Sequence, residues 1–92
     1  MDVVWDPQKG RSNYAKHGVS FSDAEPALYD PAGVTFEDTA DRGEERFITI
    51  GLDALGQIVV VVYTHREADI RIISARRATK RERAQYAEGT RL

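Results

Sequence analysis

Basic side chains crowd the last third of this sequence, and most of them are arginines, whose planar guanidinium groups suit the binding of phosphate. Residues 63–92 contain eight Lys or Arg against four Asp or Glu, whereas residues 1–62 contain five against eleven. The formal net charge of −2 therefore hides a basic end on an acidic chain. This asymmetry indicates one localised surface for a polyanion or for an acidic partner, although a solvated helix face would have the same composition.

Arg76 and Arg77 stand where a predicted strand, 70–76, meets a predicted helix. If the strand ends before them, both guanidinium groups could hold one phosphate beside the free amides of the helix start. The alternative is that they form salt bridges with the acidic part of the chain, for example with Glu44 or Glu45.

Arg71 and Arg66 are the next candidates for phosphate contact. Because side chains alternate along a strand, we expect Arg71 and Arg77 on one face, and Ile70, Ile72, Ser74 and Arg76 on the other. Arg71 must then reach an open groove or pair with a carboxylate. Arg66 is predicted to lie in the polar turn 65–68, at the mouth of the sheet.

Two histidines, His17 and His65, are the first candidates for proton transfer, since histidine exchanges protons most readily near neutral pH. His17 falls at the end of a predicted helix, where a purely structural role at the helix terminus is the alternative. His65 falls in the predicted turn and could be an ordinary exposed residue. Glu45 is a weaker candidate for a general base, because nothing apolar encloses it.

Two further basic groups could follow the backbone of a nucleic acid. Lys9 and Lys16 are seven residues apart on one face of a predicted helix, with Asn13 between them. Lys80 and Arg81 begin the last predicted helix. In both groups an ordinary solvated helix face is the alternative, and the second group could instead bind a protein partner.

Trp5 and Tyr14 could stack on unpaired bases, as aromatic side chains do in single-strand recognition. Packing into the hydrophobic core is the alternative for both, and Tyr63 and Tyr86 allow the same two interpretations.

Capping residues mark the helices that must position these groups. Asp6-Pro7 opens a helix predicted over 7–16, which Gly18 ends, although Gly10 weakens it by about 1 kcal/mol relative to Ala. Ser20 and Asp23 open a second helix over 21–29, in which Pro26 predicts a kink or an early end. Thr79 and Glu82 form a capping box for a helix that runs to about Glu88.

Between the helices the pattern of apolar residues changes to that of strands. After a short apolar start at 3–5, strands are predicted over 34–37, 46–52, 58–63 and 70–76, with a hairpin turn at 53–56. The order βααββββα predicts a single α+β domain over residues 1–92. We expect a mostly antiparallel sheet with N-terminal helices and a C-terminal helix, all packed to one side.

Several classes of function are disfavoured by what the sequence lacks. It has no cysteine, so a disulfide framework and a thiolate metal site are excluded. The two histidines are isolated and the acidic residues have no metal-loop spacing, so we expect neither a metal nor another cofactor. No signal segment or membrane span is recognisable, which favours a cytoplasmic protein.

Three segments of the sequence resemble the BrnT family of toxins. They read WDPQKGRSNYAKHGVSF, GEERFITIG and RIISARRATKRERAQY, occur in this order and lie between residues 5 and 86. Gly10 and Pro26 depart from the stronger helix formers usual in that family, which bears on local helix stability only.

The resemblance implies a fold similar to the RelE-type ribonuclease toxins. It also implies RNA cleavage without a metal and neutralisation by a ribbon-helix-helix antitoxin of the BrnA type. Operator DNA would be bound only through the toxin–antitoxin complex. RelE-type toxins often rely on arginine and lysine, so the resemblance suggests Arg66, Arg71, Arg76 and Arg77 for the phosphate and His17, His65 or Lys16 for proton transfer.

Three hypotheses remain open from the sequence. The first is an endoribonuclease toxin that inhibits growth. The second is a non-catalytic module that binds the antitoxin and acts as a corepressor, and the third is a degenerate toxin that still binds antitoxin but no longer inhibits growth. RNA cleavage by the purified protein in EDTA separates the first from the others.

Overall fold

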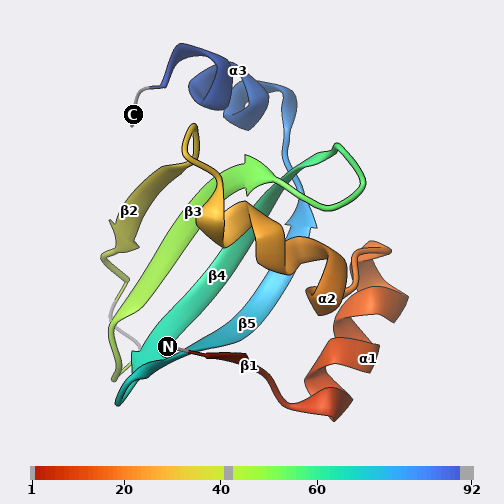
Figure 1. Ribbon diagram of the computed structural model, residues 1–92, viewed down its shortest axis with the longest axis vertical. Coiled ribbons are helices and arrows are strands. Elements are labelled where there is room, and N and C mark those ends of the chain that lie inside the picture. Colours follow the sequence, from red (N-terminus) through yellow and green to blue (C-terminus); the bar gives the residue numbers. More distant parts are fainter. Residues whose placement is uncertain (1, 41–42, 90–92) are drawn as a thin grey trace.

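A five-stranded sheet forms the centre of the protein in the computed structural model, which describes residues 2–40 and 43–89 (Figure 1). The spatial order of the strands is β1-β5-β4-β3-β2. Only the pairing of β1 with β5 is parallel, and the three other pairings are antiparallel. The strands are β1 (Val3–Val4), β2 (Val34–Asp38), β3 (Arg46–Leu52), β4 (Ile58–Arg66) and β5 (Asp69–Arg77).

Within the described ranges, three α-helices and one 3₁₀ helix accompany the sheet: α1 (Pro7–His17), α2 (Phe21–Ala24), η1 (Glu25–Tyr29) and α3 (Lys80–Glu88). The predicted element order and the mostly antiparallel α+β fold are confirmed. The predicted effect of Pro26 is confirmed as well, because the α-helix gives way to the 3₁₀ helix at Glu25. No helix in the described ranges is long and apolar enough to cross a membrane.

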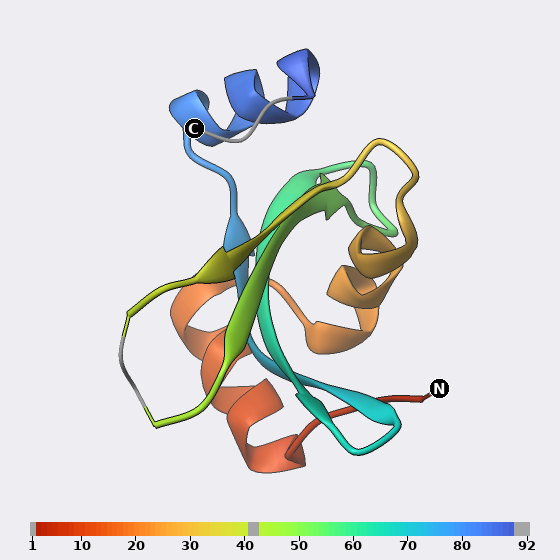
Figure 2. The same ribbon diagram turned by 90° about the vertical axis from the view of Figure 1, so that its left-hand side faces the viewer.

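The two faces of the sheet carry different helices. Val59 and Val61 of β4 face α2 and η1, whose Phe21, Ala24 and Ala27 belong to the same buried cluster. Val60, between them, points to the opposite face and packs in a second cluster against which Tyr86 of α3 lies. Figure 2 shows α2 and η1 on one side of the sheet and α3 over its upper end, across from them. The expectation that all helices pack to one side was therefore wrong.

A β-bulge in β5 rearranges the side chains of this strand. Val62 pairs with Ser74 but Tyr63 pairs with Ile72, so Ile73 is an extra residue. Ile72 therefore joins the core face with Ala75, whereas Arg71 shares the other face with Ser74 and Arg76. The predicted alternation placed Arg71 opposite Arg76 and was wrong, because it assumed an uninterrupted strand.

The β4–β5 hairpin is also tighter than predicted. Pairing continues to Arg66 and Asp69, and the turn is made by Glu67, with a φ of 57°, and Ala68. His65 and Arg66 are thus the last residues of β4 and not part of the turn, a second correction to the prediction.

Asn13 holds α1 against the outer edge of β5, beyond the short β1. Its side-chain amide accepts a hydrogen bond from the Ala75 N–H (3.2 Å) and donates to the carbonyl oxygens of Ala75 (2.8 Å) and Val19 (2.9 Å). The side chain thereby supplies to the strand edge the bonds that a neighbouring strand would make.

On the face of the sheet that packs against η1, the backbone of β3 comes into direct contact with the backbone of η1. A Cβ atom at Gly51 would come within 2.6 Å of the Ala27 carbonyl oxygen, so only glycine fits there. Ala27 itself is fully buried.

Candidate functional site

A hollow of about 260 Å³ lies between α1 and the bulged part of β5. Lys9, Lys16 and His17 line it from α1, and Ser74 lines it from the strand. The two lysines of the predicted stripe and the histidine at the helix end are therefore brought together. No carboxylate forms an ion pair with either lysine within the described ranges.

The local reason for this arrangement is the way α1 ends. Asp6 caps its first turn by accepting from the Gln8 N–H, and Gly18 terminates it in a left-handed conformation (φ 71°), as predicted. Lys16 and His17 occupy the last turn, where the helix dipole favours positive charge. The prediction that His17 lies at a helix terminus is confirmed, and its proton-transfer role stays a prediction.

Arg76 forms a two-point ion pair with Glu82. The distances are 2.7 Å between Nη1 and Oε1 and 2.9 Å between Nη2 and Oε2. The hydrogen bonds from Arg76 hold the pKa of Glu82 down at about 2, and the same contact raises the pKa of Arg76. Arg76 does have a carboxylate partner, but it is neither Glu44 nor Glu45.

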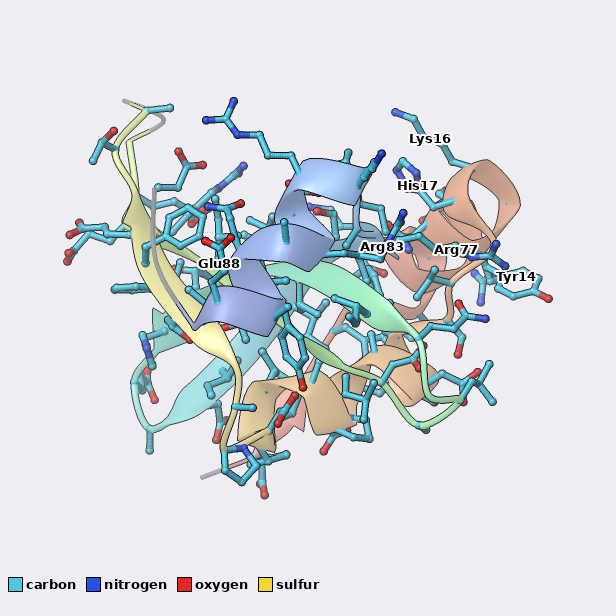
Figure 3. All side chains as sticks on the ribbon, turned by 90° about the horizontal axis from the view of Figure 1, so that it is seen from above. Tyr14, Lys16, His17, Arg77, Arg83 and Glu88 are labelled. Carbon is cyan, nitrogen blue, oxygen red and sulfur yellow. The ribbon has the colours of Figure 1, made fainter. Side chains whose placement is uncertain are left out.

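Arg77 ends β5 and lines, with Arg83, a hollow of about 380 Å³ at the junction with α3. Arg77 is exposed and has no ion pair with any described residue. Arg83 donates to the Ala78 carbonyl oxygen at 3.1 Å. Figure 3 shows both side chains on the side of the molecule where Lys16 and His17 project from α1.

Arg83 belongs to the basic run 80–83 that opens the last predicted helix, but its place beside Arg77 was not predicted from the sequence. The available signal was its position four residues after the helix cap Thr79, which places it one turn along α3 and back over the end of β5. Lys80 and Arg81 are exposed at the start of the same helix, as predicted.

Arg71 and Arg66 lie farther from this end of the sheet. Arg71 is on the same face as Arg76, about 13 Å along the strand, and Arg66 pairs with Asp69, about 23 Å from Arg77. The structure therefore does not gather all four predicted arginines around a single phosphate.

The aromatic candidates occupy both predicted kinds of environment. His65 packs its ring edge-to-face on Phe47 and Tyr63, with centroid distances of 5.0 and 5.9 Å. Trp5 packs against Phe21 at the border of the core, whereas Tyr14 is 59% exposed. In the part of the chain that the structure describes, no group of three or more His, Cys, Asp or Glu side chains could hold a metal ion.

Comparison with known proteins places this arrangement in a family. The family model described as the BrnT ribonuclease toxin of type II toxin–antitoxin systems matches residues 5–82. This chain belongs to the BrnT family. A crystal structure of the ribonuclease toxin BrnT from Brucella abortus is similar, with 28% identity and a TM-score of 0.67, over 87% of this chain and 99% of that one. A comparison with curated protein sequences gives no match.

The BrnT match extends from β1's end to the first turn of α3. It thus includes the elements that position Lys16, His17, Arg76 and Arg77. Membership in a type II toxin family also implies a cognate antitoxin as partner.

Proposed function

We propose that this BrnT-family protein is a metal-independent endoribonuclease that inhibits growth until its cognate antitoxin neutralises it. The proposal is supported chiefly by one observation: Lys16 and His17 of α1 and Arg77 and Arg83 near the start of α3 lie on one side of the molecule without carboxylate partners in the described ranges. Unpaired cations from separate elements suit a polyanionic substrate.

Metal-independent RNA cleavage needs three things. A base takes the proton of the ribose 2′-hydroxyl, cations stabilise the charge that develops on the phosphorus oxygens, and an acid protonates the leaving 5′-oxygen. In our proposal Arg77 stabilises the developing charge and Arg83 assists it. Because β5 continues through Arg77, Arg76 points to the opposite face of the strand and pairs with Glu82, so we assign it to a neighbouring phosphate. His17 transfers a proton, with Lys16 as the neighbouring cation.

The remaining cations are assigned to the rest of the RNA chain. Lys9, Lys80 and Arg81 would hold phosphates next to the cleaved bond. Arg71 and Arg66 are too far from Arg77 to share its phosphate, so they would contact more distant ones.

The partner in this proposal is a ribbon-helix-helix antitoxin of the BrnA type, acting in the cytoplasm. We expect its N-terminal segment to cover the sheet and the basic end of the toxin, and operator DNA to be bound through the complex alone. Hydrogen exchange would show protection of β5 and α3 in the complex, and unchanged exchange there would contradict this placement.

The test of cleavage uses the purified protein freed of antitoxin and a labelled single-stranded RNA, in EDTA and in Mg²⁺. We expect equal cleavage in both buffers. If the folded protein binds antitoxin but leaves RNA intact in both, the corepressor hypothesis replaces the enzyme. Cleavage in Mg²⁺ alone would contradict metal independence.

A further inference from the structure

A second hollow, of about 380 Å³, lies on the other side of α1. Its walls include Trp5, Phe21 and Tyr14, and Gly10 and Arg11 complete it from the helix. Residues 9 and 16 point about 100–160° away from residues 10 and 14 around the helix, so the two hollows flank α1 on separate sides. Nothing in the proposed cleavage chemistry uses this second one, which we call the aromatic pocket.

Three aromatic side chains, Trp5, Tyr14 and Phe21, line the aromatic pocket. The ring of Trp5 meets that of Phe21 edge-to-face, with centroids 6.0 Å apart, while Tyr14 keeps 59% of its surface exposed. The Trp5 N–H has no acceptor among the described residues. A flat ligand with an acceptor atom would meet both an aromatic wall and a free donor here.

Gly10 keeps this pocket open. A Cβ atom at this position would lie 3.5 Å from Cδ1 and 3.6 Å from Nε1 of Trp5, which is ordinary contact without a clash. Alanine at this position would favour the helix but would place its methyl group against the indole nitrogen of Trp5.

The charge around the aromatic pocket points to a polyanion. Helix α1 contains Lys9, Arg11, Lys16 and His17 and no acidic residue, although residues 1–62 as a whole carry eleven acids against five Lys or Arg. Arg11 lines the aromatic pocket itself and has no ion pair in the described ranges. Aromatic walls beside a basic helix are the combination by which proteins hold single-stranded nucleic acid.

We propose that the aromatic pocket binds one unstacked nucleobase of a single-stranded RNA whose backbone crosses the C-terminal half of α1. The base would contact Tyr14 and Trp5, and its own phosphate would lie at Arg11, which lines the same pocket. The strand would then continue across α1 towards Lys16 and His17. This inference rests on the proposed ribonuclease function and extends it, because a pocket for one base gives the protein a preference for sequence near the cleaved bond.

Trp5 is the only tryptophan in the sequence, so tryptophan fluorescence reports directly on the aromatic pocket. Single-stranded DNA oligonucleotides lack the 2′-hydroxyl and cannot be cleaved by the proposed chemistry, so binding is measured apart from cleavage. We expect them to quench Trp5 fluorescence to saturation. An oligonucleotide of the same length made of abasic nucleotides keeps the charge and should not quench.

Two variants and a matched control sharpen the test. Tyr14→Ala should weaken oligonucleotide binding about tenfold, since a base stack is lost. Tyr29→Ala removes a tyrosine with the same 59% exposure elsewhere on the surface and should leave binding unchanged. Gly10→Ala should raise the melting temperature yet weaken binding, because its methyl group narrows the pocket.

The outcomes separate this inference from the proposed function. Equal quenching by the abasic oligonucleotide, or equal effects of Tyr14→Ala and Tyr29→Ala, would overturn the base site even if RNA is cleaved. Quenching that follows the expected pattern supports it even if no RNA is cleaved. If Trp5 responds to an antitoxin peptide and to no oligonucleotide, the pocket belongs to the protein partner and the inference fails.

Discussion

Arg76 and Glu82 form the ion pair that joins the end of β5 to the first turn of α3, with nitrogen–oxygen distances of 2.7 and 2.9 Å. The same carboxylate accepts from the Thr79 N–H at 2.8 Å, and the Glu82 N–H donates to the Thr79 hydroxyl at 3.2 Å. One side chain thus caps the helix and orients an arginine. The direction of the Arg76 guanidinium is therefore set by the beginning of α3.

We expect Glu82→Gln to lower the free energy of unfolding by about 1 kcal/mol, because the amide keeps a capping acceptor but loses the ion pair. Arg76 is 41% exposed, so water screens the pair and the loss stays below what a pKa of about 2 for Glu82 would imply by itself. Urea denaturation measures the loss. Glu37→Gln, on exposed β2, is the control and should change little.

The same ion pair predicts how stability depends on pH. The pKa of Glu82 is about 2 in the folded protein against an ordinary value of 4.5, so the unfolded chain takes up the proton first as pH falls. Its contribution is therefore complete above pH 4.5 and is lost between 4.5 and 2. Denaturation curves of the original protein and Glu82→Gln should converge near pH 2, and a constant difference down to that pH would contradict the assignment.

Arg77→Ala should reduce RNA cleavage by a factor of about 10²–10³ without loss of stability, because Arg77 is exposed and has no ion pair with any described residue. Arg76→Ala should lower both the cleavage rate and the free energy of unfolding, since it leaves Glu82 without its partner. Cleavage rates and urea midpoints of the two variants distinguish these effects. Arg77→Lys keeps the charge but not the planar fork, and we expect an intermediate rate.

Asn13→Ala should lower the free energy of unfolding by about 2–3 kcal/mol, because it leaves the buried N–H and carbonyl of Ala75 and the Val19 carbonyl without partners. Thermal denaturation gives the loss. Ser12→Ala, at an exposed neighbouring position of α1, is the control. If both variants melt alike, the amide of Asn13 does not hold α1 on the strand.

Features set by a few neighbouring residues could be predicted from the sequence. The caps at Asp6, Ser20 and Thr79 each depend on hydrogen bonds within three residues, and all three are present. The effect of Pro26 is equally local, because the missing N–H acts within one turn.

Features that depend on distant parts of the chain could not be predicted from the sequence. The bulge at Ile73 arises from pairing with β4, and it moves Arg71 to the face of Arg76 although the residue pattern alternates. The role of Asn13 depends on a strand 62 residues away, so the sequence suggested only a polar position between two lysines. Glu82 was recognised as a capping residue, but its pairing with Arg76 requires the angle at which α3 leaves the sheet.

Helices η1 and α3 pack on opposite faces of the sheet, and they are attached to it in different ways. At Gly51 the backbone of β3 touches the backbone of η1, and this contact leaves no room for adjustment. Helix α3 is attached instead through side chains: Tyr86 packs on the second apolar cluster, and its hydroxyl donates to Asp30 at 2.7 Å. Because α3 carries Arg83 and its Glu82 orients Arg76, any shift of this helix on the sheet would displace both guanidinium groups together.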